Sequence, residues 1–185
     1  ETSAAVNPRQ ATPSLPRADA AAIEQAAEWL AAADNPVIVC QRGDPEGRLG
    51  VALSAFAERF ALPVAEYLTM RNVLPSAHPM QAGYDSGPLV AEADAILVID
   101  SLVPWISRNH QPRADARVIH LGADPQFQRM PVRSFPSDLS IIGDPAAAVT
   151  ELHAAMEARG AGNAARGERI AKEGEMRRAT AREQA

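Results

Sequence analysis

The stretches Val37-Ile38-Val39-Cys40, Ala95-Ile96-Leu97-Val98-Ile99, Val118-Ile119-His120-Leu121 and Leu139-Ser140-Ile141-Ile142 decide the fold. Each is an almost unbroken apolar run that ends at a polar or glycine-containing turn. Unbroken β-branched runs are typical of strands buried on both faces of a sheet, whereas half-exposed strands alternate apolar and polar residues. Helical patterns separate several of these runs, which predicts an α/β fold with a parallel sheet and helices on both faces.

Helical patterns lie on both sides of the first of these strands. Asp19 is a good N-terminal cap, and the apolar spacing after it predicts a helix that ends before Asn35-Pro36. A second helix is expected over residues 46–61, where apolar residues recur at i, i+4, i+7 and i+11. Asp144-Pro145 predicts the start of a later helix, because aspartate caps well and proline is tolerated at the first helical position.

Charge and composition limit the classes of function. The chain of 185 residues carries a net charge of −5, although residues 160–185 hold six basic against four acidic residues. The remaining body is therefore clearly acidic, which argues against a nucleic-acid partner, since such a partner favours a basic stripe. No run approaches the roughly 18 apolar residues needed to cross a bilayer, so we expect no membrane span.

Cys40 is the only cysteine of the chain. A single thiol excludes an internal disulfide and any zinc site that needs several cysteines. Because Cys40 ends an apolar strand, we expect it to be a buried packing residue and not a nucleophile. This cysteine usage indicates a reducing, cytoplasmic compartment.

Composition divides the chain into three parts. Residues 1–17 contain three prolines among small polar residues, which predicts an extended interdomain linker. Residues 18–159 hold the predicted strands and main helices, so we expect a single domain there. Residues 160–185 are polar and rich in Ala, Arg and Glu, which indicates a polar linker, helical at most. Since the chain begins with Glu1, we expect it to be a piece of a longer protein, with this linker leading toward a C-terminal domain.

The turn at residues 41–47 lies where a Rossmann phosphate-binding fingerprint would be found. It is not G-x-G-x-x-G, because Arg42 and two acids replace the closely spaced glycines, and the acids would repel a phosphate. A plain strand–helix connection is the favoured interpretation. Three residues at strand ends remain weak candidates for cofactor contact: Gly43, Asp100 and Asp124. The two aspartates have an ordinary alternative as helix caps or turn formers.

The chain shows no catalytic or metal-binding pattern. Its four histidines are scattered, and none stands at a metal-ligand spacing from another. His120 is expected to be a hydrogen-bonded histidine of the core or a strand end and not a base. No G-x-S-x-G nucleophile elbow occurs either. We therefore predict no catalytic residue and no metal ligand in this chain.

Seven short phrases follow one another in a set order: residues 21–33, Asn35–Val39, Leu62–Val64, Ala77–Pro79, Glu92–Ile99, Ala116–His120 and Ile142–Asp144. In wording and spacing they resemble the central domain of thiamine-diphosphate-dependent enzymes of the acetolactate synthase, pyruvate oxidase and benzoylformate decarboxylase type. The resemblance covers roughly residues 18–158. It implies a three-layer, Rossmann-like domain with about six parallel strands, of which the weak Met80–Tyr84 segment would be the third.

The resemblance also implies what lies outside this chain. In such enzymes thiamine diphosphate and Mg²⁺ bind between a pyrimidine-binding domain, which supplies a catalytic Glu, and a pyrophosphate-binding domain with a Gly-Asp-Gly motif. No Gly-Asp-Gly occurs here. The chain is thus expected to be the structural middle domain of a 2-oxo-acid decarboxylase or carboligase, inactive in isolation. Its implied partners are the two flanking domains, in a homodimeric or homotetrameric enzyme.

Some members of this family bind FAD in the central domain, and three departures argue against FAD here. Cys40–Gly43 replaces the glycine-rich end of the first strand, and Asp100-Ser101-Leu102 replaces a Gly-Ala-Arg. His120–Asp124 replaces His-Ile-Asp-Ile-Asp and loses the first acid. A diphosphate bound here would have no positive partner and would meet the carboxylate of Asp100 instead, and this like-charge contact is unfavourable. The alternative function is a non-catalytic Rossmann-like module that binds a nucleotide of the FAD or NAD type, or regulates through it.

Overall fold

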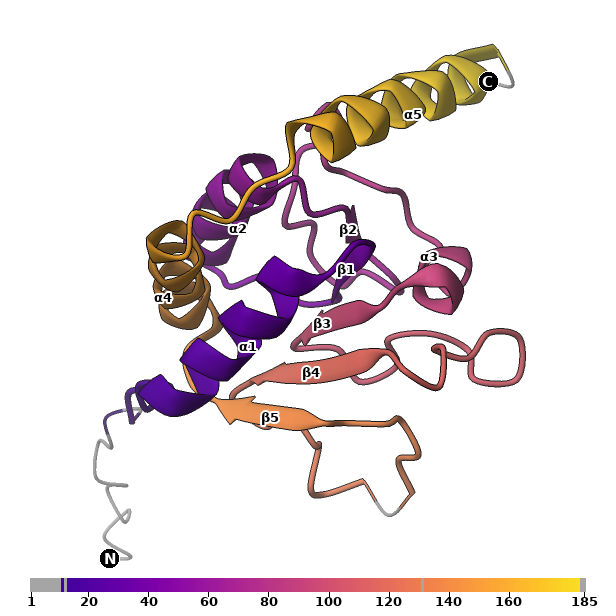
Figure 1. Ribbon diagram of the computed structural model, residues 1–185. Helices are drawn as coiled ribbons and strands as arrows, with labels where there is room; N and C mark the ends of the chain where they lie inside the picture. The colour runs from indigo at the N-terminus through magenta and orange to yellow at the C-terminus, as the bar shows by residue number, and fades with distance from the viewer. Residues whose placement is uncertain (1–10, 12, 131, 184–185) are drawn as a thin grey trace, which may run out of the picture.

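The computed structural model describes residue 11 and residues 13–130 and 132–183. Its centre is a parallel five-stranded sheet in the order β2-β1-β3-β4-β5 (Figure 1). The strands are β1 (Pro36–Cys40), β2 (Val64–Ala65), β3 (Ala95–Ile99), β4 (Arg117–Gly122) and β5 (Leu139–Ile142). Each of the four apolar stretches forms one strand, which confirms the predicted α/β class.

The strands read as unbroken apolar runs because they face two cores. Side chains alternate between the faces of a sheet. In β1, Ile38 and Cys40 join the larger core, whereas Val37 and Val39 join the smaller one. Its neighbour β3 follows the same alternation in register, so that Val39 pairs with Val98. Both faces of the central strands are therefore withdrawn from water.

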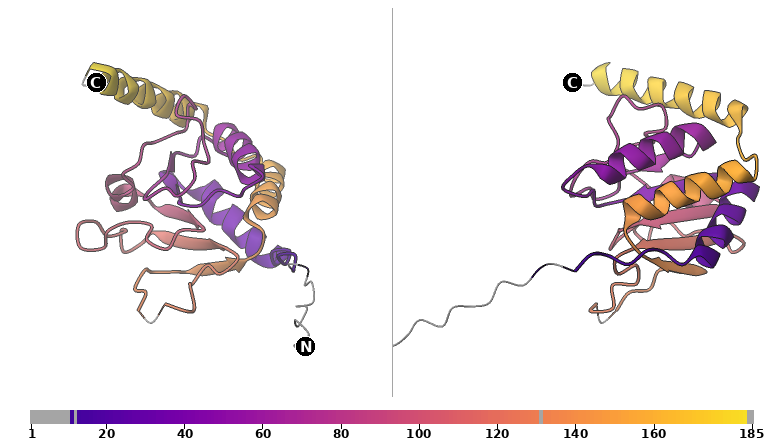
Figure 2. Two further views of the ribbon diagram at one scale, coloured as in Figure 1. Left: turned by 180° about the vertical axis from the view of Figure 1, so that it is seen from behind. Right: turned by 90° about the vertical axis from the view of Figure 1, so that its left-hand side faces the viewer.

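Three helices cover one face of the sheet: α1 (Ala20–Ala32), α2 (Arg48–Phe60) and α4 (Pro145–Ala158) (Figure 2). The other face is covered by the short α3 (Gly87–Glu92) and by loops around Trp105, which packs edge-to-face on Phe135. This second layer is thinner than the helical layer we predicted. Residues 101–138 contain five prolines, which interrupt helices.

The segment predicted as the third of about six strands, Met80–Tyr84, contributes only an isolated parallel bridge between Val64 and Gln81. Backbone hydrogen bonds of 2.8 Å join Val64 to the residues on both sides of Gln81. One further backbone hydrogen bond, from the N–H of Glu66 to the carbonyl of Gly83 at 3.0 Å, is shifted by one residue, and Gly83 has a φ of 101°, so no regular ladder forms. The sheet therefore has five strands where about six were expected.

The polar tail forms α5 (Ala164–Glu183), which lies beyond the β2 edge of the sheet, on the opposite side from β5 (Figure 1). Three of its residues are buried: Ile170, which is 3% exposed, Arg166, which is 8% exposed, and Gly174. Most of its other described side chains face solvent. Within the described residues no helix combines the length and the apolar character that crossing a membrane requires, the 20-residue α5 included.

Cys40 lies at the end of β1 and is completely buried, as predicted. Burial raises the pKa of its thiol far above the ordinary range, and the nearby carboxylates of Glu66 and Asp100 raise it further. At neutral pH Cys40 is thus an uncharged packing residue.

Candidate functional site

The candidate site is a pocket of about 220 Å³ at the carboxyl ends of the strands. It lies at the point where the order of the strands reverses, since β2 flanks β1 on one side and β3 flanks it on the other. Open α/β sheets bind ligands at such switch points. The residues that line the pocket include Leu15, Arg42, Gly43, Asp44, Asp100 and Asp144. Two of the three predicted candidates, Gly43 and Asp100, thus share one pocket, whereas Asp124 is not among its lining residues.

The turn from β1 into α2 is built around an aspartate. Both oxygens of Asp44 accept backbone hydrogen bonds at the start of the helix, from Arg48 at 2.9 Å and from Leu49 at 2.8 Å. Gly47 precedes the helix with a φ of 74°, a left-handed conformation that suits glycine. Gly47, and not the candidate Gly43, is therefore the glycine that this turn requires.

The start of α4 has the same construction. Asp144 accepts a hydrogen bond of 3.0 Å from the backbone N–H of Ala146, as the predicted cap should. Its carboxylate also lies 2.8 Å from the guanidinium of Arg48, which in turn lies 3.5 Å from Asp44. Although partial burial acts in the opposite direction, the hydrogen bond from Arg48 holds the pKa of Asp144 below its ordinary value. Arg48 thus joins the two cap residues.

Asp100 has a positive partner that sequence reasoning did not identify. Its carboxylate lies 3.7 Å from the guanidinium of Arg42. Because β1 and β3 pair in register, with Cys40 opposite Ile99, the residues just beyond both strands come together. Burial raises the pKa of Asp100, and Arg42 partly counteracts that effect. Asp100 also has a φ of 41°, an uncommon conformation for a non-glycine residue.

A second arginine that sequence reasoning did not single out lies beside this rim. The guanidinium carbon of Arg133 is 5.2 Å from the ring centres of both Phe127 and Phe135. It donates a hydrogen bond of 3.2 Å to the backbone carbonyl of Ser101 and approaches Nδ1 of His120 at 3.2 Å. Burial lowers the pKa of Arg133. Nothing in the local sequence pattern marked this arginine, because it reaches the site from the long loop before β5.

His120 is a buried strand histidine, as predicted. Its Nε2 lies 3.0 Å from the backbone carbonyl of Pro136, while Nδ1 faces Arg133. The arrangement fits a neutral ring that donates from Nε2. Burial, with the positive charge of Arg133, lowers the pKa of His120 to about 4. The ring is therefore uncharged at neutral pH and has no free nitrogen for proton transfer.

Asp124 serves a turn. Its two carboxylate oxygens lie 3.2 and 3.1 Å from the backbone N–H of Gln128, which donates to them. The backbone carbonyl of Asp124 accepts a further hydrogen bond from Phe127. Asp124 therefore has the turn-forming role that is the ordinary alternative to cofactor contact.

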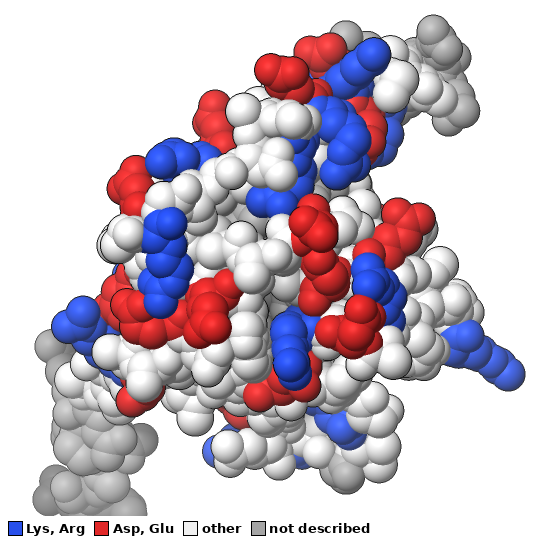
Figure 3. Space-filling model, in the orientation of Figure 1, with Lys and Arg blue, Asp and Glu red and all other residues white. Residues whose placement is uncertain are grey.

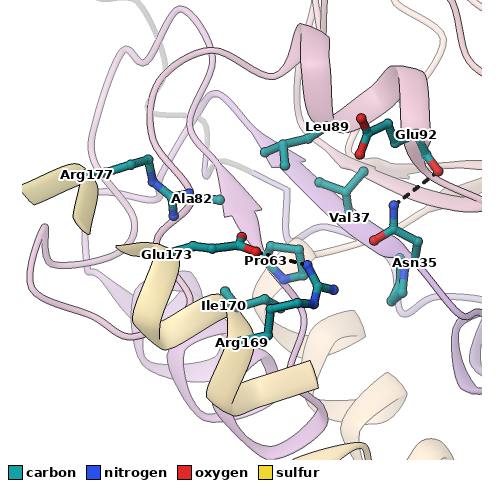
Figure 4. A pocket seen from close by; sticks show the side chains of 11 residues that line it. Asn35, Val37, Pro63, Ala82, Leu89, Glu92, Arg169, Ile170, Glu173 and Arg177 are labelled. Carbon is teal, nitrogen blue, oxygen red and sulfur yellow. Dashed lines mark hydrogen bonds and ion pairs between the residues drawn. The ribbon is translucent and has the colours of Figure 1, made fainter. Parts of the chain in front are cut away.

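A second pocket, of about 140 Å³, lies at the opposite end of β1, beneath α5 (Figure 4). Its apolar floor includes Val37 and Ile170, and its polar wall is largely paired within itself. Arg169 bonds Glu173 at 3.2 Å, and the Asn35 amide donates to the Glu92 carbonyl at 3.1 Å. We interpret this pocket as a packing seam between α5 and the body.

The described residues lack a cluster of metal-ligating side chains. No group of three or more His, Cys, Asp or Glu side chains among them is arranged to hold a metal ion. Two of the three carboxylates of the strand-end pocket, Asp44 and Asp144, already accept hydrogen bonds from backbone N–H groups, so the pocket does not fit thiamine diphosphate with its Mg²⁺, and no step of that chemistry is assigned to this chain. On the face shown in Figure 3, acidic and basic side chains are interleaved. What the strand-end residues do is hold loops and helix ends together.

The family of the chain follows from a comparison with known families. A family model described as "Thiamine pyrophosphate enzyme, central domain" matches residues 23–152. The chain belongs to this central-domain family. The matched residues contain all five strands, so the match to the family extends over the whole sheet and does not rest on a single motif. The resemblance drawn from the seven phrases is thereby confirmed.

Curated relatives of this central domain are much longer than the chain. It is similar to oxalyl-CoA decarboxylase from Escherichia coli strain K12, with 24% identity over 106 residues, 56% of this chain and 19% of the relative. The oxalyl-CoA decarboxylase of Escherichia coli O157:H7 matches equally well. The chain thus spans about a fifth (19%) of the length of these relatives.

Solved structures show the same central-domain fold. An enzyme from Mycobacterium smegmatis described as thiamin diphosphate-dependent superposes with a TM-score of 0.65 at 22% identity, covering 80% of this chain and 30% of that one. Benzoylformate decarboxylase from Polynucleobacter necessarius gives a TM-score of 0.65 at 20% identity, covering 84% and 30%. At this identity the likeness establishes the fold.

Proposed function

We propose that this chain is the structural central domain of a thiamine-diphosphate-dependent 2-oxo-acid decarboxylase or carboligase, and that it is inactive alone. The observation that carries the proposal is the family match, which spans residues 23–152 and hence every strand. Oxalyl-CoA decarboxylase and benzoylformate decarboxylase are both decarboxylases by name, which favours that branch. The lack of a metal cluster among the described residues agrees with a supporting role.

The proposed role is that of a rigid spacer. The described N-terminal segment approaches the sheet beside β5, while α5 leaves beyond the β2 edge (Figure 1). Domains attached at these two ends would be held apart by the width of the sheet. In the complete enzyme, thiamine diphosphate and Mg²⁺ would be held by flanking pyrimidine- and pyrophosphate-binding domains. There the coenzyme supplies carbanion stabilisation, and protein groups supply orientation. We also propose a homodimeric or homotetrameric enzyme in the cytoplasm.

Titration calorimetry tests this proposal. The chain alone, given thiamine diphosphate and Mg²⁺, should show no binding, and it should release no carbon dioxide from 2-oxo acids. The intact polypeptide that carries this domain should bind the coenzyme. It should also release carbon dioxide from a 2-oxo acid or from an acyl-CoA thioester that carries a free carboxylate. Micromolar coenzyme binding by the chain alone would contradict the structural role, and failure of the intact polypeptide to bind would contradict the family-based function.

A second candidate function, a nucleotide-binding or regulatory module, is favoured by one observation. The Nε atoms of Arg42 and Arg133 are buried without a hydrogen-bond partner, and both guanidinium carbons lie 5.2 Å from the Phe127 ring centre. Buried donors without partners are uncommon. Adenine nucleotide released on denaturation of the purified protein, or an absorbance band of bound flavin, would support this candidate.

A further inference from the structure

The strand-end pocket lies where α/β folds of this kind hold a dinucleotide. In such folds the diphosphate binds at the N-terminus of the helix after the first strand, because free backbone N–H groups and the helix dipole attract an anion. FAD is the group that the family resemblance implies for this position. In this chain, however, the anion positions are already held. We propose that Asp44 and Asp144 take the place of the diphosphate, so that the chain itself fills the anion positions of the crevice.

The first anion position is at α2. A diphosphate here would need the first backbone N–H groups of the helix. The N–H groups of Arg48 and Leu49 already donate to the two oxygens of Asp44, at 2.9 and 2.8 Å. A phosphate oxygen could reach these donors only by displacing the carboxylate of Asp44, four and five residues earlier in the same turn.

The second anion position is at α4, where Asp144 accepts from Ala146 at 3.0 Å. The backbone N–H of Asp144 is occupied as well, since it donates to the carbonyl of Pro16 at 3.2 Å. Arg48, the cation that a phosphate would otherwise attract, lies 2.8 Å from Asp144 and 3.5 Å from Asp44. Both helix N-termini and the arginine between them are thus committed to internal partners.

The N-terminal segment narrows the crevice further. Of the linker predicted at residues 1–17, the structure describes residue 11 and residues 13–17. Leu15 lines the pocket, and Arg17 is tied to Glu151 of α4 at 2.7 Å. The segment also packs closely on the turn after β5, since a Cβ added to Gly143 would stand 3.0 Å from the backbone nitrogen of Ala18. The described N-terminal segment therefore contributes one wall of the pocket and packs against the turn beside it.

Volume and charge both oppose a dinucleotide. The remaining pocket of about 220 Å³ is below the roughly 300–1,000 Å³ of sites that enclose drug-sized ligands. Its acidic lining residues are Asp44, Asp100 and Asp144, and its basic ones are Arg42 and Arg48. An added diphosphate would thus enter a lining that already holds one more acid than base, and like charges at this range repel. The residues present do not fit FAD.

The double substitution Asp44→Asn with Asp144→Asn tests the inference. Asparagine keeps an oxygen that caps a helix, so the fold should persist. It removes two negative charges, so the lining changes from one acid in excess to one base in excess, and Arg48 loses its counter-ions. We expect calorimetry with pyrophosphate and with ADP to show at least about tenfold tighter binding to this variant than to the unmodified chain. Asp115→Asn, which removes a carboxylate paired with Arg113 elsewhere on the surface, should leave binding unchanged.

The unmodified chain supplies an independent arm of the experiment. It should bind neither ADP nor FAD, and neither should raise its melting temperature. Sub-millimolar binding of either by the unmodified chain would overturn the inference, even if the double variant failed to fold. A double variant with a native circular dichroism spectrum and no gain in pyrophosphate affinity would overturn it as well. Since the inference rests on the pocket alone, neither result bears on whether the intact polypeptide is a decarboxylase.

Discussion

Replacing Arg166 by alanine should release α5 from the body of the domain. Its guanidinium donates to four backbone carbonyls: Phe60 and Ala61 at 2.9 Å, Ala33 at 3.0 Å and Asp34 at 3.4 Å. Two of these carbonyls lie at the C-terminal end of α2 and two follow α1. One side chain on α5 therefore satisfies acceptors at the ends of two other helices.

The expected loss follows from these contacts. A hydrogen bond to a charged group contributes about 1.5–3 kcal/mol. The negative end of each helix dipole adds roughly 0.3–1 kcal/mol for a nearby cation. The four bonds share one guanidinium, and water can replace them once α5 undocks, so we expect a net loss of about 2–4 kcal/mol. At roughly 2–4 °C per kcal/mol for a chain of this size, cooperative unfolding would move down by about 4–16 °C.

Hydrogen exchange and thermal unfolding together check this prediction. In Arg166→Ala, α5 amides should exchange faster, while amides of β1 and β3 keep more protection. The matched control is Arg169→Ala on the same helix, because its ion pair with Glu173 is exposed and is worth only about 0.3–0.5 kcal/mol. Arg166→Lys should lie between, since an ammonium cannot span both helix ends. If Arg166→Ala has the melting temperature and the α5 amide exchange rates of the Arg169→Ala control, the four hydrogen bonds of Arg166 do not stabilise the docking of α5, and the prediction is refuted.

Three further results are expected. Gly50→Ala in α2 should destabilise by about 1–3 kcal/mol in urea unfolding, because the added Cβ would stand 2.8 Å from the Val73 carbonyl oxygen; an unchanged midpoint would contradict this contact. His120 titrates at about 4 when folded against about 6.5 when unfolded, so stability should fall as pH drops from about 6.5 to 4, and His120→Gln should flatten that slope. Iodoacetamide should leave the buried Cys40 unmodified in the native chain and alkylate it in urea, as read by mass spectrometry.

Features within one segment were predictable from sequence. Unbroken runs such as Ala95–Ile99 report burial on both faces, and Asp19 and Asp144 cap helices as expected because a cap depends only on residues a few positions away. The strand predicted at Met80–Tyr84 failed where one backbone conformation decided the outcome: the positive φ of Gly83 accompanies a one-residue shift in the pairing, and only a single bridge forms. A sequence pattern shows that apolar residues recur with the period of a strand, but it does not show where a positive φ angle ends the strand.

The site was harder to predict because its contacts join distant parts of the chain. The pair of Arg42 and Asp100 follows from β1 lying beside β3. The pairing of these two strands therefore predicts that the residues just beyond each strand lie close together. Arg133 and Arg166 carried no such signal. Each stands in a polar stretch that reads as loop or solvated helix, and only the packed structure shows which carbonyls and rings they meet.

The helix ends of this domain share one electrostatic solution. Asp44 and Asp144 place carboxylates on the positive ends of α2 and α4, and Arg166 places a guanidinium on the negative ends of α1 and α2. In a dinucleotide-binding relative of this fold, the ligand supplies the charge at one of these ends, and stability then depends on ligand concentration. Here every charge comes from the chain. A domain that completes its own helix ends can hold its shape while catalysis proceeds elsewhere, which is what a spacer between two catalytic domains requires.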